Sequence, residues 1–375
     1  MLEILRRLAC EVHLKICKPL LILFLSATAN TEAVAQGCSP VRLDAKGGPL
    51  HDLPVFDQGP LPLCDAHSSA LLIDAVRFYQ NGRKTFLPIT SPITLAARTA
   101  DRTGFSQIEG PSIETLLEKV PKFGVCDHEH ISKQLVQAIE DETCSDFQEL
   151  FTSLKPGGSK TFLKKFSSCG LNRPDGAMDS VKVFSRLLKT DANAGALKKK
   201  FDEMCGSTFY KPPISFPIYN HQRSSPFVPG TLQEQQRHNS LKKSIDDALD
   251  GPMPVPPIIR YCASFLYDKD APSGIDPTTG NLRSCKYTNS SGTVSRENHS
   301  SVIAGRRPSV DGKSCEYLIR NSYGASCDQP YSTKWQCDVT KGGLPCPAGE
   351  KCGGQIWVDE VALLRNSQDV IYVQP

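Results

Sequence analysis

The sequence lacks a strong excess of charge of one sign. Its 375 residues carry a formal net charge of only +3, and lysines and arginines are spread along the chain apart from the lysine run 198–200, which fits a solvated helix face. So small a charge gives no reason to expect a nucleic-acid partner. With 39% hydrophobic and 22% charged residues, the composition is that of a globular protein large enough for two modest lobes or one large domain.

A hydrophobic run long enough to cross a bilayer is missing from the N-terminal region. The apolar run PLLILFLSATA, residues 19–29, is too short for a transmembrane helix. Basic residues precede it and small-residue sites follow it, an order that is typical of a secretory signal peptide cut after Ala35 or, alternatively, after Ala29. We therefore expect residues 1–35 to be removed, no stable membrane span in the mature protein, and a secreted or periplasmic location.

Metal-binding spacings are also missing. Near the C-terminus, Cys327, Cys337, Cys346 and Cys352 lie ten, nine and six residues apart, without the Cys-x-x-Cys pair of a zinc knuckle. The acidic segment 268–281 does not match the spacing of a calcium-binding loop. We expect a rigid loop held by disulfides in the first region, a solvated loop in the second, and neither a metal ion nor a cofactor.

Cysteine itself is abundant. Of fifteen cysteines, Cys10 and Cys17 leave with the signal peptide, so thirteen remain in a chain bound for an oxidising compartment. An odd number leaves one thiol unpaired. If Cys64 is that thiol, the other twelve can form six disulfides, whose connectivity the sequence does not determine. The twelve are Cys38, Cys126, Cys144, Cys169, Cys205, Cys262, Cys285, Cys315, Cys327, Cys337, Cys346 and Cys352.

Cys64 lies in the most informative stretch of the chain, residues 55–80. The apolar positions after it predict a broadly buried helix. Unpaired N–H groups and the macrodipole at the first helical turn favour a thiolate, so Cys64 is a candidate nucleophile. Six residues earlier, Gln58 precedes Gly59, whose tight turn would allow the Gln58 amide to donate to a developing oxyanion. The alternative interpretation of Cys64 is a half-cystine in a secreted loop.

A thiolate nucleophile needs a base within reach and a group that orients the base. The segment ENHSSVIAGRR, residues 297–307, places His299 at the head of an apolar strand. The segment CEYLIRNSYG, residues 315–324, places Asn321 at the end of the next strand, 22 residues further on. Two adjacent strands that end side by side would bring the two side chains together. A strand histidine and a turn asparagine without catalytic roles are the alternatives.

The spacing from the Gln-Gly pair to Cys64 and the Asn-Ser-Tyr-Gly segment resemble papain-like cysteine peptidases. The resemblance covers two blocks, residues 40–127 and 240–365. It implies an α+β, papain-like fold of two lobes, a helical left lobe and a β-rich right lobe, with a helical insertion between them. The expected divisions are a signal peptide at 1–35, the left lobe at 36–127, a helical and Pro-rich insertion at 128–238 and the right lobe at 239–375.

The resemblance also implies roles for four residues. Cys64 would attack the scissile carbonyl of a peptide or protein substrate, and His299 would exchange protons with it. Asn321 would orient His299, and Gln58 would stabilise the oxyanion. The protein would then be a secreted thiol protease.

Several positions depart from the family pattern. Asp65 replaces the usual aromatic residue after the nucleophile, Leu61 replaces a disulfide cysteine, and Tyr323 replaces a tryptophan. Asp65 adds negative charge beside the thiol and would alter its pKa. His67, three residues after Cys64, is a rival base, although a helical residue at that spacing should point into the lobe.

Two other functions remain open. The altered aromatic residues favour a catalytically silent papain-like protein that binds a partner. The same thiol chemistry would also serve another acyl transferase or amidase, such as a hydrolase of cell-wall peptides. Neither the preferred side chain of a substrate nor the oligomeric state can be inferred from the sequence.

Overall fold

The structure is a computed structural model that describes the chain in ranges. The described residues are 38–59, 61–84, 88–99, 112–140, 180–212, 217–221, 231–262, 264–267, 286–288, 294–296, 298–325, 331–345 and 353–374. The expected signal peptide at 1–35 lies outside them, as does the segment 141–179 within the expected insertion.

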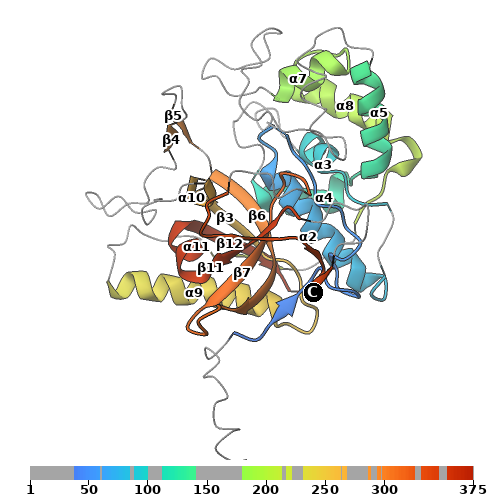
Figure 1. The fold of residues 1–375 in the computed structure, drawn as a ribbon. Helices are drawn as coiled ribbons and strands as arrows, with labels where there is room; N and C mark the ends of the chain where they lie inside the picture. The colour runs from blue at the N-terminus through green and yellow to red at the C-terminus, as the bar shows by residue number, and fades with distance from the viewer. Residues whose placement is uncertain are drawn as a thin grey trace, which may run out of the picture.

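An antiparallel sheet is the centre of the fold (Figure 1). Its strands run in the order β2-β12-β3-β6-β7-β11-β8, and β1 pairs with β6. The strands are β1 (Val41–Arg42), β2 (Ile218–His221), β3 (Ile258–Cys262), β6 (Asn298–Pro308), β7 (Cys315–Arg320), β8 (Gln336–Asp338), β11 (Gln355–Asp359) and β12 (Ser367–Val373). Two small pairs stand outside it: β4 (Lys286–Thr288) with β5 (Val294–Arg296), and β9 (Thr340–Lys341) with β10 (Leu344–Pro345).

Helices pack beside the sheet in groups. The helices are α2 (Cys64–Gln80), α3 (Pro92–Thr99), α4 (Ile113–Phe123), α5 (His128–Glu140), α7 (Ser180–Leu187), α8 (Ala194–Cys205), α9 (Leu232–Leu249), α10 (Ser264–Tyr267) and α11 (Glu360–Asn366). Helix α2 contacts β6 as well as α3 and α4, while α5, α7 and α8 lie together beyond α3 (Figure 1). Helix α9 packs on β12 and α11. The predicted α+β fold class is confirmed.

Helix α2 is the central helix that the sequence predicts. Fifteen of its 17 residues are buried, from Cys64 to Phe78. Burial of its charged pair is tolerated because the groups bond one another: Arg77 Nη1 donates to Asp74 Oδ1 at 2.6 Å. Thr90 also bonds Asp74. Its N–H donates to Asp74 Oδ2 at 2.8 Å, and its hydroxyl donates to Asp74 Oδ1 at 2.7 Å.

Neighbouring residues set both ends of helix α4. The Ser112 side chain accepts a hydrogen bond from the N–H of Thr115 and caps the first turn. Gly124 ends the helix at φ 67°, a conformation that favours glycine. Its apolar side chains Leu116, Leu117 and Val120 are buried.

Two apolar segments are each part strand and part helix. Among the described residues of 253–267, strand β3 is followed by the short helix α10. Within 353–364, β11 stops at Asp359, whose side chain accepts from the N–H of Ala362 at 2.9 Å and starts α11. The apolar residues after Asp359 would by themselves favour a longer strand. The Asp359 N-cap ends the strand and starts a helix instead.

The sheet includes segments from outside the expected right lobe. Strand β2 lies within the expected insertion, 128–238, yet pairs with β12 from Ile218 to His221. Strand β1, from the expected left lobe, pairs with β6. The domain boundaries stay a proposal.

Disulfides join distant segments of the described chain. Cys38 is bonded to Cys315, and Cys126 to Cys205. Cys262 and Cys337 are also disulfide-bonded. Among the described helices, none is both long and apolar enough to cross a membrane.

Candidate active site

Cys64 is the first residue of α2. It is the free cysteine among those the structure describes, and its side chain is buried, with 8% of its surface exposed. Leu63 precedes it and offers no side-chain cap, so the first turn of α2 has no side-chain acceptor at that position. Because α2 packs against β6, the thiol lies at the junction of helix and sheet.

The surroundings of Cys64 favour the thiol over the thiolate. Its Sγ lies 3.9 Å from Asp65 Oδ1. Burial raises the pKa of Cys64 to about 12, and the Asp65 carboxylate adds to the effect; the backbone N–H groups of Ser300 and Asp65 and the charge of Arg260 oppose it. The expected lowering of the thiol pKa at a helix start is therefore wrong for this structure, because desolvation and Asp65 outweigh the helix dipole.

His299 and Asn321 lie together on neighbouring strands. His299 is the second residue of β6, and Asn321 directly follows β7. His299 Nε2 lies 2.6 Å from Asn321 Oδ1, which also accepts from the Ser301 hydroxyl at 3.3 Å and the Ser322 N–H at 2.8 Å. Because this oxygen accepts all three bonds, Nε2 carries the proton of the neutral ring and Nδ1 is left to accept one.

The His299 ring is held neutral and flat against Tyr323. Burial lowers the pKa of His299 to about 4, although its bond to Asn321 acts in the opposite direction. The Tyr323 ring stacks on the imidazole, with centroids 4.8 Å apart and 17° between the planes, and its hydroxyl lies 3.4 Å from Nδ1. Asn321 is fixed from its other end, since its Nδ2 donates to the Tyr331 hydroxyl at 3.2 Å.

Gln58 is anchored beside the Asn321 segment. Its N–H donates to Ser322 O at 2.8 Å, and its Oε1 accepts from the Ser322 hydroxyl. Its Nε2 donates to Leu61 O at 2.8 Å. An amide nitrogen has two hydrogens, so one remains for a substrate oxygen.

The structure brings three of the predicted residues into one polar cluster but does not bond the nucleophile to its base. Within the described chain, the side-chain partner of Cys64 Sγ is Asp65, while the two nitrogens of His299 face Asn321 and Tyr323. For His299 to act as a base towards Cys64, its Nδ1 would have to come within hydrogen-bond reach of Sγ.

Two residues of the site, Ser300 and Arg260, were missed by sequence reasoning. The Ser300 hydroxyl donates to Asp65 Oδ1. Arg260 Nη2 lies 3.7 Å from Asp65 Oδ2 and 3.8 Å from Glu114 Oε2, and its Nη1 lies 2.8 Å from Asp369 Oδ2. Arg260 thus connects α2 and α4 with the sheet. Ser300 directly follows His299, and Arg260 is the charged residue inside the apolar strand IIRYC, so both had a signal in the sequence.

The rival base His67 faces the interior of the helical group. Its side chain is buried, and its ring lies edge-on to Phe56, with centroids 5.4 Å apart. Burial lowers the pKa of His67 to about 3, and the charges of His128 and His299 add to the effect. Its Nδ1 has no hydrogen-bond partner among the described residues. No contact with Cys64 supports its role as base.

Comparison with known proteins gives distant matches to solved structures alone. No protein-family model matches the chain, and no curated protein sequence does. The crystal structure of xylellain, a cysteine protease from Xylella fastidiosa, matches with a TM-score of 0.39 and 13% identity, over 92% of this chain and 88% of that one. The Amb a 11 cysteine protease of ragweed pollen, in its proform, gives 0.36 and 13%, over 92% and 66%.

A third solved structure gives a similarly distant match. Digestive procathepsin L 3 of the Tenebrio molitor larval midgut gives a TM-score of 0.35 and 11% identity, over 92% of this chain and 72% of that one. The chain is structurally similar to papain-like cysteine proteases at low sequence identity.

Proposed function

We propose that this protein is an exported cysteine peptidase that hydrolyses peptide bonds. The observation that carries the proposal is the 2.6 Å bond between His299 Nε2 and Asn321 Oδ1, on the strand against which the Cys64 helix packs. A neutral imidazole with its proton fixed on Nε2 presents Nδ1 as a proton acceptor, which a thiol nucleophile requires.

In this mechanism the Cys64 thiol gives its proton to His299 Nδ1 as Sγ attacks the scissile carbonyl carbon. The imidazolium then donates that proton to the leaving amine, and a thioester to Cys64 remains. Water attacks the thioester after losing a proton to His299, which releases the acid and restores the thiol. Asn321 positions the ring throughout by its bond to Nε2.

The oxyanion of the tetrahedral intermediate would be stabilised by Gln58. The second hydrogen of its Nε2 is the candidate donor, and the Cys64 backbone N–H is the other. The two bonds to Ser322 and the bond to Leu61 hold the Gln58 amide in place before a substrate arrives. Removal of one such donor typically costs about 10² to 10³ in kcat.

The remaining parts of the proposal concern location and organisation. The disulfides Cys38–Cys315 and Cys126–Cys205 support export to an oxidising compartment after removal of residues 1–35. The substrate would be a peptide or protein. The divisions at 36–127, 128–238 and 239–375 are proposed as left lobe, insertion and right lobe.

A catalytically silent binding protein is the second candidate. The raised pKa of Cys64, about 12, and the neutral His299 support it, because a thiol next to a neutral imidazole is a weak nucleophile. In that case the region around Cys64 and His299 would bind a partner without cleaving it.

Turnover of a peptide library by the exported chain distinguishes the peptidase from the catalytically silent binding protein. Under the peptidase proposal, Cys64→Ala and His299→Ala each abolish cleavage, and the double variant is no worse, because residues acting as a unit are non-additive. Asn321→Ala keeps partial activity, since Asn321 exchanges no proton. His67→Ala is the matched control and keeps the activity of a folded enzyme.

Other outcomes assign other functions. Near-native turnover by His299→Ala would remove His299 as the base and favour His67. No turnover of any peptide by the folded wild-type chain would favour the silent binding protein. Incorporation of an added amine in place of hydrolysis would indicate an acyl transferase.

A further inference from the structure

Two tyrosines hold the side-chain amide of Asn321 from opposite ends. At the nitrogen end, Asn321 Nδ2 donates to the Tyr331 hydroxyl at 3.2 Å. At the oxygen end, the Ser301 hydroxyl donates to Asn321 Oδ1 at 3.3 Å, and Ser301 Oγ lies 2.9 Å from the Tyr261 hydroxyl. Asn321, Ser301 and Tyr261 are almost completely buried, so water does not compete for these bonds.

The direction of each bond follows from the chemistry of the groups. An amide oxygen can only accept, so the Ser301 hydroxyl gives its proton to Asn321 Oδ1. Ser301 Oγ is then left as an acceptor, and the Tyr261 hydroxyl donates to it. An amide nitrogen can only donate, so the Tyr331 oxygen accepts. Because burial raises the pKa of Tyr331, this hydroxyl stays neutral.

The two ends of the amide are not equally supported. Asn321 Oδ1 accepts from His299 Nε2, the Ser301 hydroxyl and the Ser322 N–H. Asn321 Nδ2 has the Tyr331 hydroxyl as its partner among the described residues. A buried amide nitrogen that loses its acceptor is costly, and the side chain turns to find another. Loss of this hydroxyl would therefore favour a rotation that also takes Oδ1 away from the imidazole.

The segment that carries Tyr331 is fixed to α10 on its other side. The Ser332 N–H donates to Leu266 O at 2.7 Å, and Trp335 Nε1 donates to Phe265 O at 3.2 Å. The Trp335 ring also lies edge-on to that of Phe265, with centroids 5.6 Å apart. The position of the Tyr331 hydroxyl is therefore set independently of the amide that it holds.

We propose that Tyr331 is a positioning residue for the proposed peptidase reaction: its hydroxyl holds Asn321 Nδ2 and thereby keeps Oδ1 on His299 Nε2. Tyr261 supports the oxygen end through Ser301. Tyr331 exchanges no proton in the mechanism and acts through the amide alone. The inference rests on the proposed function, because the orientation of the imidazole matters only if the ring exchanges protons with the nucleophile.

This role also gives a purpose to the cysteine-rich region between β7 and β11. The sequence predicts a rigid loop held by disulfides there, and Tyr331 lies within it. Cys337, in β8, is disulfide-bonded. A hydroxyl can orient an amide only when its own position is fixed, so the rigidity of this region would serve the site beside it.

Kinetics of Tyr331→Phe in two backgrounds test the role. The variant keeps the ring and removes the hydroxyl, so kcat/KM for a peptide should fall by about two- to tenfold in otherwise wild-type protein. In the Asn321→Ala background the same substitution should change kcat/KM by less than about twofold, because no amide is left to hold. Tyr79→Phe is the matched control: it removes a hydroxyl that donates to Pro254 O at 2.8 Å, and it should keep the wild-type rate.

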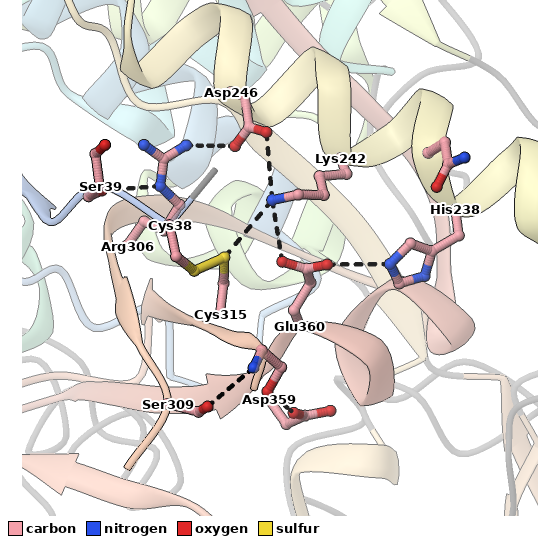
Figure 2. A network of polar contacts seen from close by, with 12 residues as sticks. Cys38, Ser39, His238, Lys242, Asp246, Arg306, Ser309, Cys315, Asp359 and Glu360 are labelled. Carbon is pink, nitrogen blue, oxygen red and sulfur yellow. Dashed lines mark hydrogen bonds and ion pairs between the residues drawn. A yellow bond between two sulfur atoms is a disulfide. The ribbon is translucent and has the colours of Figure 1, made fainter. Parts of the chain in front are cut away.

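A second control separates positioning from a general loss of stability. Glu360→Gln alters the charged network of Figure 2, where the Glu360 oxygens lie 3.1 Å from His238 Nε2 and 3.1 Å from Lys242 Nζ. This network borders Cys315, at the opposite end of β7 from Asn321. Glu360→Gln should therefore unfold at a lower urea concentration than wild type and still keep the wild-type kcat/KM.

A measurement without substrate reads the same contact. In protein with isotope-labelled histidine, the Nε2–H resonance that is missing from His299→Ala reports the bond to Asn321. Its proton should exchange with water faster in Tyr331→Phe than in wild type or Tyr79→Phe. Equal exchange in wild type and Tyr331→Phe, or an equal loss of rate with and without Asn321, would overturn the role of Tyr331. A wild type without turnover would instead overturn the peptidase proposal, and with it the reaction that Tyr331 serves.

Discussion

Tyr323 lies almost parallel to the His299 imidazole, with 4.8 Å between ring centroids and 17° between the planes. The Tyr323 ring covers the imidazole next to its hydrogen bond with Asn321. The papain-like sequence pattern has a tryptophan at the position of Tyr323. A smaller flat ring therefore supplies the stacking surface, and its hydroxyl lies 3.4 Å from Nδ1.

The first prediction concerns this stacking. Tyr323→Ala should lower kcat by about two- to tenfold, since an aromatic pair contributes about 0.5–1.5 kcal/mol. Tyr323→Phe keeps the ring and should stay within about twofold of wild type on the same scale. Steady-state kinetics with a peptide substrate measure both. A Phe variant as impaired as the Ala variant would assign the effect to the hydroxyl instead of the ring.

A second prediction concerns Asp65, whose carboxylate raises the pKa of Cys64. Asp65→Asn removes the charge and keeps an oxygen for the Ser300 hydroxyl. The pKa of Cys64 should fall by about one unit, because a nearby like charge disfavours the thiolate. The pH dependence of Cys64 alkylation by iodoacetamide gives the value.

Ser300→Ala is the control for this measurement. It removes the hydrogen bond to Asp65 and leaves the carboxylate charge, so it should not lower the pKa of Cys64. If the midpoint of the alkylation profile of Asp65→Asn lies at the same pH as that of wild type, or at a higher pH, the electrostatic explanation is contradicted.

A third prediction concerns the count of free thiols. The natively exported protein, denatured without reductant, should contain one cysteine that iodoacetamide modifies, and peptide mapping should identify it as Cys64. Cys38, Cys315, Cys126 and Cys205 should stay unmodified, because they form the two disulfides. Recovery of Cys64 in a disulfide would exclude it as the nucleophile.

The fourth prediction concerns stability at acid pH. Burial lowers the pKa of His67 to about 3, so its folded-state pKa lies below its unfolded value. The stability tied to the neutral ring is complete above about pH 6.5 and is lost as pH falls towards the folded pKa. Between pH 7 and pH 4 this group should cost about 3 kcal/mol.

His67→Phe keeps a ring against Phe56 and removes the titration. Urea unfolding of wild type and variant at both pH values should show a smaller loss of stability in the variant. Asp369 acts in the opposite direction, since burial raises its pKa to about 6, so the difference between the two proteins is the quantity to compare. An equal loss in both would mean that His67 is not responsible.

Local signals in the sequence predict a good part of this fold. Ser112 and Gly124 predict both ends of α4, because capping depends on a few neighbouring residues. The strand positions of His299 and Asn321 follow from apolar runs, and the antiparallel pairing of β6 and β7 then places them side by side.

Features that depend on packing between distant segments could not be predicted in this way. The state of the Cys64 thiol depends on burial and on Asp65, which oppose the helix effect that the local sequence indicates. The pairing of β2 with β12 joins residues about 150 positions apart, and no local pattern specifies such a partner. The same holds for the disulfide connectivity.

The separation along the chain of the groups that meet here also bears on biogenesis. Cys38 and Cys315 are 277 residues apart, and Gln58 and Ser322 are 264 apart. Helix α2, with Cys64, emerges from the ribosome long before His299 and Asn321. High contact order slows folding, so under the peptidase proposal we expect each growing chain to have no peptidase activity until its last third has been made and docked.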